Sequence, residues 1–471
     1  MIIELKDPIF LLLNKLVAAQ KADAYLVGGY VRDLFLQRLS KDIDVVVIGD
    51  GIALARSFAE MIPNSEFAFF KTYGTAMVKT AEWEVEFVGA RQESYTHDSR
   101  KPTVNPGTLS DDQNRRDFTI NALAISLQAH NFGTLIDPFE GISDLEAKII
   151  RTPRNPDITF SDDPLRMMRA IRFSAQLDFD ILPETYHAIK RNAHRLKIIS
   201  GERIADEMNK IILSKKPSRG LKQLFDCGIL QQFFPELAAM QGVETIEDKA
   251  HKDNFYHTLM VLDNISDETN DLWLRWAALL HDIAKPLTKR FSAVEGWTFH
   301  GHEDKGSHMV SKLFRKLKLP LNDKMKFVEK MVALHHRPKA LAEQGVTDSA
   351  IRRLVVDAGD DLEDLFTLCR ADMTSSNPKK IAFYKLKLIE VAKLVAEVSE
   401  RDALRNFQPP ITGEDIMNIF GIGPSREVGI IKTEIREAIL EGKIKNTKED
   451  ALQLMHTKAA EFGFKPISND L

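Results

Sequence analysis

The hydrophobic period of the sequence changes near residue 136, and this change limits the folds open to the chain more than any other feature. Before it, helical stretches alternate with short strands in AYLVGG (24–29), KDIDVVVIGD (41–50) and WEVEFVGAR (83–91). After it, the helical period persists to the end of the chain. This order predicts an α+β multidomain protein, in which a small head with a mixed sheet precedes all-α domains.

Breaks in the pattern divide the chain further. Stretches rich in Pro, Ser or Gly interrupt it at 151–160 (RTPRNPDITF), 214–220 (SKKPSRG) and 408–413 (QPPITG). We expect a head at 1–135, a helical neck at 136–240, a third helical domain at 241–400 and a helical tail at 401–471. Asp163 is expected to cap the helix over 162–176, with Pro164 at its first position.

The composition of the chain excludes several classes of protein. Cys227 and Cys369 are the two cysteines of the chain, too few for a disulfide framework or a Cys-rich zinc module. No run of about 18 uncharged apolar residues occurs, so we expect a cytoplasmic protein that does not enter a membrane. The formal charge of -4 argues against a uniformly basic surface. Residues 151–220, however, hold 14 Lys and Arg against 9 Asp and Glu, a balance of +5.

The head carries a glycine pair close to alternating carboxylates. Gly28 and Gly29 end a strand and feed a helix, so backbone amides can approach a phosphate, and Arg32 can add a guanidinium. Asp42 and Asp44 share one face of a strand, about 7 Å apart, which suits divalent metal ions. Without the other motifs, the glycine pair is explained equally well by an ordinary turn, and Asp42 and Asp44 by a solvent-exposed sheet edge. Glu86 offers a third carboxylate from a neighbouring strand, but Glu84 shares its face, so spacing leaves this choice open.

Two further segments of the head complete the pattern. RRDFTINALA (115–124) is a basic pair before a helix. Residues 93–114 are polar and aperiodic, and we expect a long functional or disordered loop there.

Together these stretches resemble the class II tRNA nucleotidyltransferase and bacterial poly(A) polymerase superfamily. Six motifs occur in the order of that superfamily: GGYVRD with DID (28–44), VEFVGAR (85–91), RRDFTINA (115–122), DPFEGISDL (137–145), SDDPLRMMRAIRF (161–173) and GERIADE (201–207). The resemblance implies a polymerase-β-like head with a two-metal mechanism, in which Asp42 and Asp44 bind Mg²⁺ and Glu86 completes the catalytic carboxylates. It implies that the nucleotide is held by Gly28, Gly29, Arg32, Arg115, Arg116, Asp117 and Asn121.

The resemblance also assigns base selection to Asp163 and Arg166, with Arg169 in the same nucleotide-binding helix. A carboxylate accepts from the exocyclic amine that C and A share, and a guanidinium donates to ring acceptors. The alternative is that Asp163 only caps the helix and pairs with Arg166. Asp162 departs from the family, which has Glu there. Arg166, Arg169 and Arg172 recur at every third residue and predict a basic stripe for RNA.

A cluster of His and Asp at 250–375 is not explained by the head. Imidazole and carboxylate suit a divalent transition metal. The spacing resembles the HD phosphohydrolase superfamily, which identifies 241–400 as an HD domain and implies His257, His281, Asp282 and Asp372 as core ligands. His302 and His335 match the further ligands of binuclear members, although His336 is an alternative to His335. The implied reaction is hydrolysis of phosphomonoesters or 2′,3′-cyclic phosphates; the alternative is a degenerate HD fold that supports RNA.

These resemblances predict an enzyme that adds CCA to the 3′ end of tRNA from CTP and ATP, with an attached phosphohydrolase. A bacterial poly(A) polymerase shares the motifs of the head, but the chain ends EFGFKPISNDL, without the basic extension typical of that enzyme. A partial enzyme that adds only CC or only A is a further alternative, and an RNA-binding scaffold with an inactive head is another. The sequence leaves the oligomeric state open.

Overall fold

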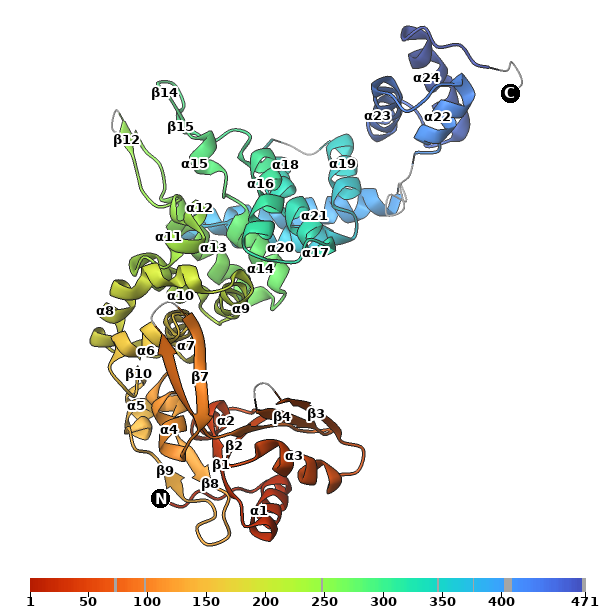
Figure 1. The fold of residues 1–471 in the computed structure, drawn as a ribbon. Helices are drawn as coiled ribbons and strands as arrows, with labels where there is room; N and C mark the ends of the chain where they lie inside the picture. Colours follow the sequence, from red (N-terminus) through yellow and green to blue (C-terminus); the bar gives the residue numbers. More distant parts are fainter. Residues whose placement is uncertain are drawn as a thin grey trace. The chain divides into compact units, whose positions relative to one another are not determined.

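The computed structural model describes residues 1–71, 74–96, 99–246, 249–344, 347–375, 377–401 and 409–467 (Figure 1). It divides into two compact units, Met1–Gln241 with Arg315–Leu319, and Gly242–Phe314 with Pro320–Leu471. The predicted head and neck thus lie within one unit, and the four-part division stays a prediction. None of the described helices is long and apolar enough to cross a bilayer.

The head is a seven-stranded mixed sheet in the order β3-β4-β5-β2-β1-β8-β9. The strands are β1 (Asp23–Val27), β2 (Asp42–Ile48), β3 (Glu66–Phe70), β4 (Thr75–Lys79), β5 (Glu84–Gly89), β8 (Ala124–Ser126) and β9 (Leu135–Ile136). The helices are α1 (Pro8–Gln20), α2 (Gly28–Phe35), α3 (Gly51–Glu60) and α4 (Leu109–Asn114). Strands β2 and β5 pair in parallel, and the other neighbours are antiparallel. Helix α3 packs on β4 and β5, where the Phe58 and Phe87 rings lie 5.5 Å apart.

The prediction of a long loop at 93–114 is wrong. Strands β6 (Arg91–Thr96) and β7 (Ser99–Pro106) form an antiparallel hairpin beside the main sheet, and α4 follows directly (Figure 1). Helix α4 begins at a capping box, in which Thr108 and Asp111 satisfy each other's backbone amides. The Ser, Thr and Asp residues that suggested a loop therefore serve a hairpin and a helix cap.

The neck is helical, with one local difference from expectation. Its helices are α5 (Gly141–Ala147), α6 (Pro156–Asp162), α7 (Leu165–Leu177), α8 (Pro183–Asn192), α9 (Gly201–Ile212), α10 (Pro217–Asp226), α11 (Leu230–Phe233) and α12 (Pro235–Ala238). The predicted break at 151–160 contains the start of α6, because Asn155 caps it and Pro156 fits its first position. Helix α7 begins at Leu165, whose amide donates to Oδ1 of Asp163 over 3.1 Å.

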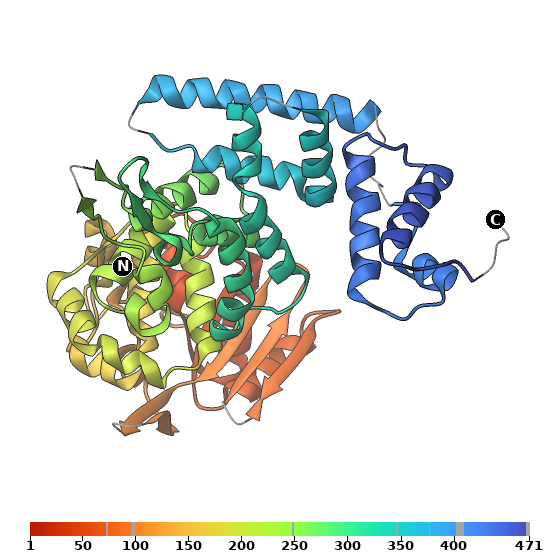
Figure 2. The ribbon, with the colours of Figure 1, turned by 90° about the horizontal axis from the view of Figure 1, so that it is seen from above.

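The second unit is also predominantly helical. Its helices are α13 (Asn254–Glu268), α14 (Leu272–Leu280), α15 (Lys285–Thr288), α16 (His302–Lys316), α17 (Asp323–Leu334), α18 (Arg337–Gln344), α19 (Asp348–Ala358), α20 (Leu362–Asp372), α21 (Pro378–Arg401), α22 (Gly413–Phe420), α23 (Arg426–Leu440) and α24 (Lys448–Glu461). Helix α21 packs on α18, α19 and α20 (Figure 2). Helices α22 to α24 share a core around Ile431 and Met455.

Candidate active sites

The strand register of the head brings its carboxylates together. Asp44 lies opposite Glu86 in the parallel β2–β5 pair, and Asp42 lies opposite Glu84. Burial and the neighbouring Asp42 raise the pKa of Asp44 in spite of Arg116. Burial raises the pKa of Glu86, and the charge of Asp44 raises it further. These carboxylates repel one another, so a divalent cation among them would be stabilised.

Because Gly28 has no side chain, the Asp44 carboxylate and the Arg116 guanidinium can both approach the backbone of the turn. Its φ is +73°, and a Cβ there would lie 2.7 Å from Oδ2 of Asp44 and 3.1 Å from Nη1 of Arg116. A side chain would displace both groups, so only glycine fits this position. At Gly29 a Cβ would make an ordinary 3.6 Å contact with Arg32. The close-approach argument therefore holds for Gly28 alone.

Arg32 is turned toward protein partners. Its side chain forms two 2.9 Å bonds to Asp33, and Nη1 donates to Oδ1 of Asn121 over 2.8 Å. Asn121 in turn donates to Oδ1 of Asp117 over 3.0 Å. The predicted fork onto a triphosphate is not the arrangement of this structure, in which buried Arg32 orients Asn121.

Asp112 is a buried charge that the sequence interpretation missed. It accepts a hydrogen bond from Nη2 of Arg115 and one of 2.9 Å from Nε of Arg116. Burial would raise the pKa of Asp112, but these two arginines hold it below its usual value. Asp112 lies three residues before Arg115 and four residues before Arg116, a spacing that favours pairing along one helix face. This spacing was the sequence signal for its role. It was overlooked because this stretch was expected to be a loop.

The predicted base-selecting residues lie next to the RRDF segment. Nη2 of Arg166 donates to the carbonyl oxygen of Arg115 over 2.7 Å, and its buried Nη1 has no hydrogen-bond partner in the described part of the chain. Asp163 pairs at 3.0 Å with Arg203, which the sequence interpretation did not single out, rather than with Arg166. Asp162, the departure from the family, accepts a 2.7 Å bond from Arg154.

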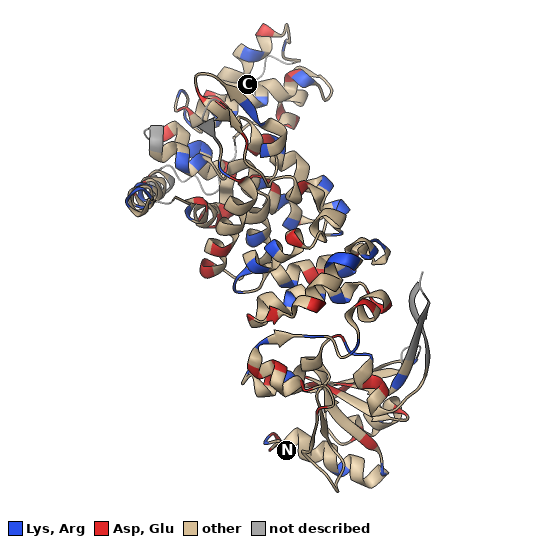
Figure 3. Ribbon diagram, turned by 90° about the vertical axis from the view of Figure 1, so that its left-hand side faces the viewer, with Lys and Arg blue, Asp and Glu red and all other residues tan. Residues whose placement is uncertain are grey.

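The arginines of α7 do not form the exposed basic stripe that was predicted to bind RNA. Arg172 is 8% exposed, and its Nε lies 2.6 Å from Oε2 of buried Glu207. Arg169 lies 2.7 Å from Oδ2 of Asp117 and 3.8 Å from Glu207. Burial would raise the pKa of Asp117, but Arg169 and Asn121 lower it to about 2. Figure 3 shows basic and acidic residues interspersed along the ribbon. On α7, Arg169 and Arg172 pair with the buried acids Asp117 and Glu207.

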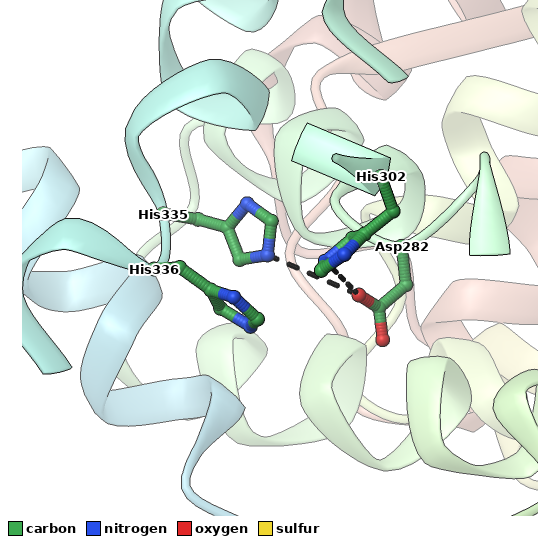
Figure 4. Close-up of side chains that lie close together, drawn as sticks. All are labelled: Asp282, His302, His335 and His336. Carbon is green, nitrogen blue, oxygen red and sulfur yellow. Dashed lines mark ion pairs between the residues drawn. The ribbon is translucent and has the colours of Figure 1, made fainter. Parts of the chain in front are cut away.

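In the second unit, the predicted HD residues converge as two groups around Asp282. In the first group, Nε2 of His257 and of His281 lie 3.0 and 3.5 Å from Oδ1 of Asp372. The second group consists of Asp282, His302, His335 and His336 (Figure 4). Nε2 of His302 and of His335 lie 3.3 and 3.9 Å from Oδ1 of Asp282.

The two oxygens of Asp282 face different groups. Oδ1 faces His302 and His335, whereas Oδ2 lies 3.4 Å from His257 and 3.2 Å from His281. Asp282 is fully buried, so its charge needs compensation within the site. Asp282 could thus contribute one oxygen to each group if that group held a divalent metal ion.

The histidines are oriented as metal ligands. Nδ1 of His281, His302 and His335 lies 2.8 Å from a backbone carbonyl oxygen in each case, so Nδ1 carries the proton. Their Nε2 atoms are buried and, among the described residues, have no hydrogen-bond partner. Burial and the charge of His281 lower the pKa of His335 well below its usual value, so His335 is neutral. Three buried Nε2 atoms that face a buried carboxylate, with Nδ1 fixed by a carbonyl oxygen in each case, fit a divalent transition metal.

The carboxylates also require positive charge beside His281. Burial would lower the pKa of His281, but Asp282 and Asp372 raise it to about 10. A metal ion supplies this charge as well as a proton does. Glu303, missed in the sequence, lies 2.7 Å from Nδ1 of His336 and orients that ring. Both His335 and His336 lie in the second group, so the choice of His335 as the ligand stays a prediction.

Comparisons with known proteins identify the family of the chain. Three family models match it: the poly A polymerase head domain over 24–151, the probable RNA and SrmB-binding site of polymerase A over 178–241, and the HD domain over 254–376. An A-adding tRNA nucleotidyltransferase of Deinococcus radiodurans is 30% identical, over 90% of this chain and 93% of that relative. The chain belongs to the tRNA nucleotidyltransferase family.

Further members of the tRNA nucleotidyltransferase family support this placement. A multifunctional CCA protein of Shewanella frigidimarina is 35% identical over 63% of this chain and 70% of its own length. The CCA-adding enzyme of Bacillus stearothermophilus, solved with CTP, superposes with a TM-score of 0.66 at 24% identity, over 97% and 99% of the two chains. This likeness confirms the predicted α+β fold with its HD domain. The head and the HD domain of the family are metal-dependent.

Proposed function

We propose that the chain adds CCA to the 3′ end of tRNA, using CTP and then ATP. The observation that supports this proposal is the buried Nη1 of Arg166, which has no hydrogen-bond partner among the described residues and lies beside the RRDF segment as a donor for a nucleobase. Asp163 would accept from the amine that C and A share. The buried, free cysteines fit the reducing cytoplasm that we propose as its location.

The chain's own residues would align the reaction. The RNA 3′-oxygen forms a bond to the α-phosphorus, the bond to the bridging oxygen breaks, and pyrophosphate leaves. Arg115, Arg116 and Asn121 would hold the triphosphate and ribose, with Asp117 orienting Asn121. Asp42, Asp44 and Glu86 would hold Mg²⁺, which when bound activates the hydroxyl and neutralises the leaving group.

Addition of A alone is the second candidate, because a relative that covers 90% of the chain is named an A-adding enzyme. The test offers purified protein tRNA ending at the discriminator base and tRNA ending in CC, each with CTP and ATP. Sequenced product ends of CCA on both substrates support the proposal. A on the CC substrate alone identifies an A-adding enzyme, CC alone a CC-adding enzyme, and long A tracts a poly(A) polymerase.

The β6–β7 hairpin lies where the family has a flexible loop, and we propose that it helps the switch from C to A. Replacement of 93–106 by a short Gly-Ser linker should spare C addition and abolish the final A. The replacement must stop before α4, because Asp112 holds Arg115 and Arg116. Equal retention of both additions would contradict this role.

For the second unit we propose hydrolysis of phosphomonoesters or 2′,3′-cyclic phosphates at RNA 3′ ends. His257, His281, His302, His335, Asp282 and Asp372 would hold a divalent transition metal, which when bound activates water. The double variant His281→Ala with Asp282→Ala should lose phosphate release and keep nucleotide addition. Loss of both activities would show that the modules are not independent, and loss of neither would show that phosphate release does not depend on this site. No phosphate release by the wild type would mean a degenerate HD fold.

A further inference from the structure

A cavity of about 400 Å³ lies beside the HD ligands. His257, Asp372 and His336 form part of its wall, so a molecule in it would reach both ligand groups. The volume is at the low end for small-molecule sites and suits one nucleotide rather than an oligonucleotide.

The rest of the wall is strongly basic. Four lysines line the cavity, and Asp372 is the sole carboxylate among its described lining residues. Two of these lysines are engaged: Nζ of Lys285 lies 2.6 Å from Asp282, and Nζ of Lys252 donates to the carbonyl oxygen of Thr374 over 3.1 Å.

The other two lysines, Lys339 and Lys380, have no ion pair within the described ranges. The ligand groups would receive one phosphate. The uncommitted ammonium groups of Lys339 and Lys380 therefore suit a second phosphate on the same ligand.

An aromatic ring stands next to the uncommitted lysines. Tyr384 is half-buried and follows Lys380 by one turn of α21, which puts both on one helix face. Nζ of Lys380 lies 5.9 Å from the Tyr384 ring centroid, and Ile381 also lines the cavity. A nucleobase stacks favourably on such a ring, while a phosphate meets the ammonium.

We propose that this cavity recognises a nucleoside 3′,5′-bisphosphate unit, through Lys339 and Lys380 for the 5′-phosphate and Tyr384 for the base. The unit is either a free nucleotide or the last nucleotide of a 3′-phosphorylated RNA, whose phosphodiester supplies the 5′-phosphate. This inference rests on the proposed phosphohydrolase function. In the reaction, a water oxygen bonds to the 3′-phosphorus, the bond from phosphorus to the ribose 3′-oxygen breaks, and that oxygen takes a proton. The products are inorganic phosphate and the 3′-hydroxyl that the head extends.

The first experiment measures phosphate release by the metal-loaded protein from adenosine 3′,5′-bisphosphate, adenosine 3′-monophosphate and a 3′-phosphorylated RNA. We expect kcat/KM for the bisphosphate to exceed that for the monophosphate by about tenfold or more. Lys380→Ala should erase this difference through KM, leaving kcat nearly unchanged. Lys385→Ala, an exposed lysine on the same helix outside the cavity, is the matched control and should change neither.

The second experiment measures the binding of adenosine 3′,5′-bisphosphate to the EDTA-treated protein by calorimetry. The same measurement on Lys380→Ala gives, by difference, the part of the binding that depends on Lys380. Because the head also binds nucleotides, only this Lys380-dependent part counts. If the bisphosphate and monophosphate are equivalent and Lys380→Ala behaves as wild type in both experiments, the inference is overturned. Lys380-dependent binding without phosphate release would overturn the hydrolase function and leave recognition standing. Lys380-dependent release from RNA, with no binding of the free bisphosphate, would support the RNA end as the source.

Discussion

The head and the HD domain both hold charged side chains that are shielded from water, but these charges are compensated in different ways. Around the head, buried arginines and carboxylates neutralise one another, as in Arg172 with Glu207 and Arg116 with Asp112. In the HD domain, Asp282 is surrounded by histidines whose Nε2 atoms have no hydrogen-bond partner among the described residues. These arginine–carboxylate pairs are complete before a nucleotide arrives. The buried Nε2 atoms and carboxylates of the HD domain, like Asp42, Asp44 and Glu86 in the head, would be stabilised by an added cation.

This difference suits the two proposed reactions. A head that must accept C and then A benefits from arginines fixed by protein partners, because the frame stays constant while the nucleotide changes. A hydrolytic site needs charge at one point, and the Asp282 oxygens provide it to two ligand groups. The predictions below test whether the two centres are separate and whether burial sets the strength of their ion pairs.

The largest expected effect separates the centres. Asp44→Asn should reduce nucleotide addition about 1000-fold, because loss of a metal-binding carboxylate removes about 4 kcal/mol of transition-state stabilisation. Single-turnover incorporation of CTP into tRNA measures this loss, and phosphate release from the HD domain should be unchanged. Asp282→Asn is the mirror control, with phosphate release lost and incorporation kept. Parallel loss of both activities in either variant would contradict the separation.

The next effect concerns the closed network of the head and neck. Glu207→Gln should lower the free energy of unfolding by about 3 kcal/mol, since Arg172 would remain buried beside a neutral partner. Urea unfolding, followed by hydrogen exchange of neck peptides, measures the change. Asp157→Asn breaks an exposed pair with Arg191 in the same neck and should change little. Equal destabilisation by the two variants would show that burial does not set the difference.

The sequence was sufficient for the fold class and for the clustering of the predicted HD residues, but not for the strand register or for the ion pairs of the head. The alternation in β2 and β5 put Glu84 and Glu86 on one face, yet the parallel register that places Glu86 opposite Asp44 depends on long-range pairing. Arg172 looked like an exposed cation because its partner, Glu207, lies 35 residues away on α9. Arg203 and Glu303 were missed because their roles depend on folded contacts, which local patterns do not encode. Asp112 was missed because the stretch that holds it was expected to be a loop.

A smaller effect should appear in acid. Because the pKa of Asp117 is lowered from 3.8 to about 2 in the folded state, its ionised form stabilises the fold above pH 3.8. This contribution, about 2 kcal/mol, is lost as pH falls from about 4 toward 2. Unfolding free energies of wild type and Asp117→Asn between pH 6 and pH 2 measure it. The variant should be less stable at pH 6 and should lose less stability on acidification; parallel curves would contradict the assignment.

The smallest expected effect tests the same side-chain chemistry with less burial. Arg353 on α19 lies 2.9 Å from Glu437 on α23, and both side chains are about one-third exposed. A double-mutant cycle with Arg353→Ala and Glu437→Ala should give a coupling of about 0.5 kcal/mol, because water and salt screen this pair. The corresponding cycle for Arg172 and Glu207 should give a coupling several times larger and insensitive to 0.5 M salt. If the exposed pair couples as strongly as the buried one, the geometry of the arginine–carboxylate contact, rather than its removal from water, sets the strength of the network around the head.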